Sequence, residues 1–124
     1  MSDTGVVMLS FDGKTVYLCC GHTDMRKSIN GLSALVENSF KLNPYTKAVF
    51  VFCNRNRDRV KILDWDVDGF WLYFKRLEKG RFHWPKEGDE PTMVLSGEEL
   101  SVLLGGVRVE LKIKRKEIFD RKTS

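Results

Sequence analysis

Successive apolar segments joined by short connections constrain the fold more than any other feature of this sequence. Residues 48–53 (AVFVFC) form an unbroken run of β-branched and aromatic side chains, typical of a strand buried on both faces. Residues 60–65 alternate apolar and polar side chains, which is typical of a half-buried strand, and residues 69–77 are rich in the aromatic side chains that favour strands. Consecutive strands with short connections pair antiparallel. The sequence therefore predicts an antiparallel β-meander with a fourth strand at 81–85, and a separate strand at 15–19.

Two helices are expected beside this meander. Apolar side chains recur in steps of three and four between Met25 and Phe40, which predicts a main helix at about 24–40 packed on one face of the sheet. A short helix is predicted near 97–104, because Ser96 is a good N-cap and glutamates follow it in the first turn. The expected fold class is α+β.

The chain length and composition are those of one globular domain. With 124 residues, the chain is expected to form a single α+β domain over 1–106, followed by a last strand and a basic C-terminal tail over 107–124. No apolar run approaches the ~18 residues of a membrane helix, and the N-terminus does not read as a secretion signal. The three cysteines lack the spacing of a disulfide framework, which predicts reduced thiols in a cytoplasmic protein.

Residues 53–69 (CNRNRDRVKILDWDVDG) carry two combs of alternating charge. The basic comb consists of Arg55, Arg57, Arg59 and Lys61, and the acidic comb of Asp64, Asp66 and Asp68. In a strand, the four cations would form one stripe. If 54–59 is instead a hairpin loop, the arginines fan outward from its tip. Both geometries can engage successive phosphates, because the planar guanidinium group grips phosphate oxygens in bidentate fashion.

Further side chains extend this candidate site. Asn56 lies within the basic comb and can hydrogen-bond sugars, phosphates or base edges. Arg26 and Lys27 lie at the predicted start of the main helix, where backbone N–H groups also attract anions. The candidate nucleic-acid-binding residues are Arg55, Asn56, Arg57, Arg59, Lys61, Arg26 and Lys27. The alternative is a solvated loop whose cations pair with the neighbouring aspartates. Aromatic side chains such as Trp71 would stack on unpaired bases or belong to the core.

The acidic comb resembles the opening of a calcium-binding loop without completing it. The template requires a bidentate Glu at position twelve, and that position holds Lys75. We therefore expect no metal site and no cofactor. Residues 67–69 are instead expected to form a hairpin turn, with Gly69 at a positive φ. No catalytic set is recognisable, because His22 and His83 lack a nucleophile at motif spacing and no Gly-rich phosphate loop is present.

Two long stretches resemble one protein family. Residues 23–36 (TDMRKSINGLSALV) and 50–85 (FVFCNRNRDRVKILDWDVDGFWLYFKRLEKGRFHWP) are similar to the TnpB-type accessory proteins of the insertion-sequence family numbered sixty-six, encoded by the second open reading frame of the element. The resemblance covers about residues 15–105. It implies a bacterial mobile-element protein that assists transposition, a DNA recombination process, beside a separate and larger DDE transposase. It implies no enzymatic activity and supplies no catalytic residues.

Two functional hypotheses follow from these observations. In the first, the protein is a non-catalytic accessory factor that binds DNA, at the element ends, through its basic surface and assists the transposase of the same element. It is then nucleoid-associated when bound to DNA. In the second, it is a protein–protein adaptor that contacts only the transposase and uses the same charges for that contact. Neither hypothesis involves a membrane or a small-molecule substrate.

Overall fold

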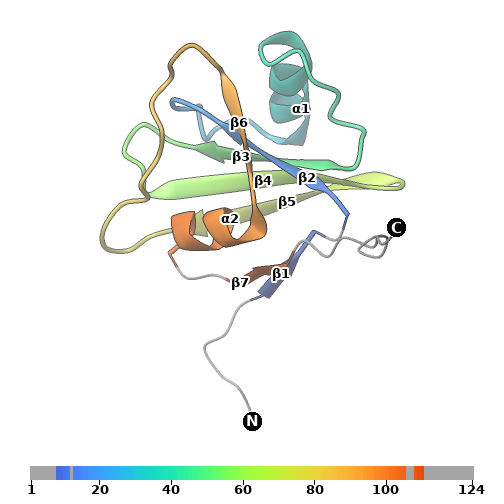
Figure 1. Ribbon diagram of the computed structural model, residues 1–124. Helices are drawn as coiled ribbons and strands as arrows, with labels where there is room; N and C mark the ends of the chain where they lie inside the picture. The colour runs from blue at the N-terminus through green and yellow to red at the C-terminus, as the bar shows by residue number, and fades with distance from the viewer. Residues whose placement is uncertain (1–7, 12, 106–107, 111–124) are drawn as a thin grey trace.

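The computed structural model describes residues 8–11, 13–105 and 108–110, and it places two helices and two sheets (Figure 1). The elements in chain order are β1 (Met8–Ser10), β2 (Thr15–Cys19), α1 (Ile29–Asn38), β3 (Ala48–Cys53), β4 (Arg59–Asp66), β5 (Gly69–Arg76), β6 (Thr92–Leu95), α2 (Gly97–Leu103) and β7 (Arg108–Glu110). The larger sheet has five strands in the order β5-β4-β3-β2-β6, and β1 pairs with β7 in a separate two-stranded sheet. The predicted α+β class, with one main and one short helix, is confirmed.

The central strand β3 is buried on both faces, as its sequence predicted. On one face, Phe50 and Phe52 pack with Leu32 of α1. On the other face, Val49 and Val51 pack in a core that also contains Leu100 and Leu104, from α2 and the residue that follows it. The sheet therefore lies between α1 and α2, and alternate residues of β3 supply both cores.

The sheet is mixed, so the expected antiparallel meander is only partly correct. Strands β3, β4 and β5 do form an antiparallel meander through short connections. Strand β2, however, runs parallel to β3, because the chain crosses over through α1 before it returns as β3. Strand β6 then adds antiparallel to the outer side of β2.

The main helix begins at Ile29, five positions later than expected. The delay has a local cause, because the side-chain Oδ1 of Asp24 accepts a hydrogen bond from the Arg26 N–H at 2.9 Å. The Asp24 carbonyl oxygen accepts a second from the Lys27 N–H at 3.2 Å. The short polar side chain of Asp24 thus stabilises a turn at the position where the first helical turn was expected. Arg26 and Lys27 therefore precede α1, and our expectation that they lie in its first turn is wrong.

The predicted strand at 81–85 is absent, although its alternating pattern reflects real burial. Phe82 and Trp84 are buried, and Trp84 Nε1 donates a hydrogen bond to the Cys19 carbonyl at 3.0 Å. This segment crosses the end of the sheet without joining its ladder. The missing strand is β6, which directly follows the breaker-rich residues 85–91.

The short helix α2 confirms its predicted capping. The Ser96 hydroxyl oxygen accepts a hydrogen bond from the Glu99 N–H at 3.1 Å, and the Glu99 carboxylate accepts one from the Ser96 N–H at 2.8 Å. The predicted last strand corresponds to β7, which pairs parallel with β1. The predicted basic tail from 111 onward lies outside the described residues. No helix in the described part of the chain is long and apolar enough to cross a membrane.

The β4–β5 hairpin places an unusual residue at its tip. Val67 adopts φ 57° and is 87% exposed, whereas Gly69 does not adopt a positive φ. Our expectation that the glycine occupies the left-handed position is therefore wrong. A β-branched residue in this region is strained, so the tip stores backbone energy.

Candidate nucleic-acid interface

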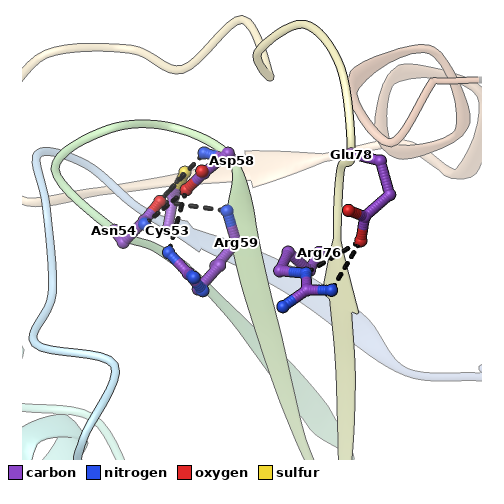
Figure 2. A network of polar contacts seen from close by, with 6 residues as sticks. All are labelled: Cys53, Asn54, Asp58, Arg59, Arg76 and Glu78. Carbon is purple, nitrogen blue, oxygen red and sulfur yellow. Dashed lines mark hydrogen bonds and ion pairs between the residues drawn. The ribbon is translucent and has the colours of Figure 1, made fainter.

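The loop between β3 and β4, residues 54–58, carries the first part of the basic comb. Its conformation depends on Asn54, whose side-chain Oδ1 accepts hydrogen bonds from the Asp58 and Arg59 N–H groups, both at 3.0 Å. The Asn54 Nδ2 donates to Asp58 Oδ1 at 2.6 Å, and this network is visible in Figure 2. The Asn54 carbonyl also accepts from the Arg57 N–H at 3.1 Å, with Arg57 at φ 61°. The loop is thus ordered by one amide side chain.

The structure divides the basic comb between two settings. Arg55, Asn56 and Arg57 lie exposed at the loop tip, so the hairpin-loop alternative describes them correctly. Arg59 and Lys61 lie on β4, on the face that bears α1. The four cations therefore do not form one continuous stripe.

Lys61 is occupied by the protein itself. Its Nζ donates hydrogen bonds to the Met25 carbonyl at 2.8 Å and to the Lys27 carbonyl at 3.0 Å. The same ammonium group lies 5.9 Å from the ring centroid of Phe74. Lys61 therefore connects the turn before α1 to strand β4, and its ammonium group is already engaged in these contacts within the protein.

Two of the other candidate arginines are paired with neighbouring carboxylates. Arg26 Nη2 lies 2.8 Å from Asp24 Oδ2, and this contact holds the pKa of Asp24 well below its usual range. Arg59 Nη1 lies 3.5 Å from Asp58 Oδ1. The pKa of Asp58 is also lowered, first by the Asn54 hydrogen bond and also by the charge of Arg59. Both carboxylates are therefore charged at neutral pH and offset part of the local positive charge.

Three exposed arginines make no such ion pair in the described part of the chain. Within the described residues, neither Arg55, Arg57 nor Arg81 makes an ion pair with a carboxylate. Arg55 Nη2 lies 3.3 Å from His22 Nε2, on the loop that follows β2. The Arg57 carbonyl accepts a hydrogen bond from the Phe82 N–H, which brings the 81–85 segment beside the loop. Three segments distant in sequence thus place cations together.

These cations surround two shallow depressions that meet at Arg57. The first is lined by Gly21, His22, Asn54, Arg55, Arg57, Trp84, Pro85, Lys86 and Glu87. The second is lined by Arg57, Arg81, Phe82, His83, Trp84, Pro85 and Leu103. We call this surface the basic end, defined by the exposed cations Arg26, Arg55, Arg57, Arg81 and Lys86. It lies where the parallel strands β2 and β3 finish.

Sequence reasoning missed Arg81, Lys86 and His22 as members of this surface. Each is separated along the chain from the basic comb, and none belongs to a recognisable spacing. The only local signal was their position in segments that precede or follow strands. Their convergence depends on the parallel β2–β3 pairing, which the sequence pattern did not reveal.

Asp64 and Asp66 of the acidic comb lie on the opposite face of β4 from Arg59 and Lys61, and Asp68 lies in the turn that follows β4. Asp64 is 4% exposed and forms an ion pair with Lys14, and its burial raises its pKa even though Lys14 opposes that effect. Asp66 accepts a hydrogen bond from Trp71 Nε1 at 3.0 Å. The described residues contain no group of three or more His, Cys, Asp or Glu side chains that could hold a metal ion.

Comparisons with known proteins identify the family. The profile of the IS66 Orf2-like proteins matches residues 14–114 of this chain. The "uncharacterized protein y4hO" of Sinorhizobium fredii (strain NBRC 101917 / NGR234) is 38% identical over 92 residues, which cover 74% of this chain and 79% of that protein. The "uncharacterized protein y4jC" of the same organism is 34% identical over 106 residues, covering 86% and 89%. No solved structure matches at a significant level. The resemblance seen in the sequence is confirmed, and the chain belongs to the IS66 Orf2-like family of transposition accessory proteins.

Proposed function

We propose that this protein assists transposition by binding DNA through the basic end, without catalysing a reaction itself. The observation that carries the proposal is the group of exposed arginines that make no ion pair with a carboxylate of the described residues, Arg55, Arg57 and Arg81. Arginine side chains held by an ordered loop lose little freedom when they grip phosphate oxygens. An unpaired cation cluster of this kind fits the regular negative charge of a duplex.

The loop geometry favours an approach by its tip. The ordered loop 54–58 connects β3 and β4, which are inner strands of the five-stranded sheet, so the loop and not the strands would contact the groove. In that approach Arg55 and Arg57 reach phosphates, while Asn56 between them faces base edges. An asparagine amide can pair with the donor and acceptor of an adenine edge. Phosphate contacts then supply affinity, and Asn56 supplies a limited sequence preference.

The positions of several charged side chains among the described residues support the same orientation. The basic end lies where β2 and β3 finish, whereas Asp66 and Asp68 flank the β4–β5 turn at the other end of β4. Such a separation of charge steers the basic end toward a polyanion and keeps the acidic end away from it. We also propose the transposase of the same element as the protein partner.

A salt titration of DNA affinity tests this proposal. Fluorescence anisotropy with a duplex from the element ends, and with an unrelated duplex, should show affinity that falls steeply with salt. The double variant Arg55→Ala/Arg57→Ala removes two phosphate contacts, so the log–log slope should flatten by about 1.8. That change corresponds to about a tenfold smaller loss of affinity over a fourfold rise in salt.

A matched control removes the same charge elsewhere. Lys41 and Lys47 are exposed and lie between α1 and the start of β3, away from the basic end. The variant Lys41→Asn/Lys47→Ala, in which Asn tolerates the φ of 58° at position 41, should keep the wild-type slope. If the Arg55/Arg57 variant keeps both affinity and slope, the proposal fails. Absence of DNA binding with Arg55-dependent capture of the transposase would instead establish the adaptor hypothesis.

A further inference from the structure

The two edges of the five-stranded sheet differ in how they are protected. Strand β6 forms one edge with only four residues and directly follows Pro91. Strand β5 forms the other edge with eight residues, and among the described residues it pairs only with β4 (Figure 1). Proteins usually blunt a long edge with proline, bulges or a covering segment, because its free N–H and C=O groups recruit another strand.

The residues along β5 are unusually apolar for an exposed edge. Positions 70–74 are all aromatic or aliphatic. Trp71 is 57% exposed on the face that bears α2, and Phe74 is 55% exposed on the face that bears α1. A shallow apolar depression lined by Leu9, Val60, Ile62, Tyr73, Phe74, Lys75 and Leu104 runs beside the strand. Exposed aromatic groups of this kind are enriched in protein interfaces.

The charges at the two ends of β5 select the orientation of an added strand. Asp66 and Asp68 precede the strand, and Lys75 and Arg76 end it. A parallel copy of β5 would bring like charges together. An antiparallel copy instead brings Asp68 toward Lys75 and Arg76 of the other chain, so this pair of ends is complementary in that orientation. Arg76 also pairs with Glu78 of its own chain at 2.8 Å, which offsets part of its charge.

We propose that two copies of this chain pair antiparallel through β5, about a twofold axis at Leu72, and join their sheets into one. In this register Leu72 lies opposite Leu72 of the second copy, and Phe70 lies opposite Phe74. On the other face, Trp71 lies opposite Tyr73. One step beyond the strand, Asp68 lies opposite Arg76. Both faces thus gain aromatic cross-strand pairs, each made twice by the symmetry.

This arrangement leaves the basic end of each copy free. The twofold axis at the centre of β5 sends the two basic ends to opposite ends of the joined sheet, because β5 of each copy runs in the opposite direction. The dimer therefore presents two separate cationic surfaces. It does not depend on the proposed function, and it holds whether those surfaces bind DNA or the transposase.

Sedimentation equilibrium of the full chain tests the dimer, at protein concentrations from low micromolar to several hundred micromolar. The wild type should dimerise within this range, and Trp71→Lys should weaken dimerisation at least about tenfold, since the contact is lost twice. Val94→Lys is the matched control, because Val94 is 63% exposed on the opposite edge strand β6. A wild type that stays monomeric throughout, or equal weakening by both variants, overturns the proposal.

A charge exchange tests the register without disturbing the apolar contacts. Asp68→Arg and Arg76→Asp should each weaken the dimer, because each places like charges opposite one another. The double variant Asp68→Arg/Arg76→Asp should restore most of the wild-type dimerisation. Restoration supports the register centred on Leu72, whereas a double variant as weak as the two single changes combined contradicts it.

Discussion

Replacing Lys61 by methionine separates its structural role from the DNA contact that its place in the basic comb suggested. The Nζ of Lys61 donates to the carbonyl oxygens of Met25 and Lys27 at 2.8 and 3.0 Å. Methionine keeps an unbranched stem of similar length and removes only the charged donor. The turn before α1 then loses its connection to β4, and the contact of the ammonium group with the Phe74 ring is lost as well.

The magnitude follows from these two hydrogen bonds. A hydrogen bond to a charged group contributes about 1.5–3 kcal/mol when well shielded. Lys61 is only partly buried, so the lower end of that range applies to each bond. The free energy of unfolding should fall by about 2–3 kcal/mol. For a domain of this size the midpoint of thermal unfolding should fall by about 6–15 °C.

Urea and thermal unfolding followed by circular dichroism measure this loss. Arg55→Met is the control, because it removes a cation from an exposed loop position and should change stability by less than about 0.5 kcal/mol. The salt slope of DNA binding should be unchanged in Lys61→Met, since the ammonium group is already engaged. The structural role of Lys61 is refuted if stability stays within about 0.5 kcal/mol of the wild type while the slope flattens by about 0.9.

Three further predictions concern the loop, the hairpin tip and the thiols. Asn54→Ala should lower stability by about 1–2 kcal/mol and loosen the loop to proteolysis. NMR titration should find the pKa of Asp58 below its usual range in the wild type and raised in the Asn54→Ala variant. This carboxylate stabilises the folded protein at pH values above its pKa in the unfolded chain, and that stabilisation is lost as the pH falls through its pKa in the folded protein. Val67→Gly should stabilise the protein by about 1 kcal/mol, because it relieves a positive φ, and unchanged or lower stability in denaturant contradicts this. Burial raises the pKa of Cys53 to about 12, so a thiol reagent should modify the less buried Cys20 first.

The strands were predictable from the sequence where burial alone determines the pattern. The unbroken apolar run of β3, the alternation in β4 and the aromatic-rich sequence of β5 place these strands within a residue or two of their observed bounds. The alternation at 81–85 led to a wrong strand prediction. Phe82 and Trp84 are buried because their side chains pack against the core, and their backbone does not pair with a strand. Periodicity reports which side chains are buried and does not report how the backbone is bonded.

The order of the strands and the start of the main helix depended on interactions that periodicity does not encode. Strand β2 pairs parallel with β3 through a crossover, and that choice decides which loops meet at the basic end. The Asp24 side chain closes a turn where the apolar period alone would begin a helix. At the site, the comb was visible in the sequence, but the role of Lys61 was not. That role depends on two carbonyl groups more than thirty residues away.

Mapping of a short duplex onto the protein by NMR tests the central claim most directly. Titration of the labelled protein should shift the backbone amide signals of the loop 54–58, of residues 21–27 and of residues 81–86, since these segments form the basic end. The signals of residues 66–68, at the far end of β4, should stay in place. Shifts confined to residues 66–68, or no shifts at all at low salt, would contradict the account.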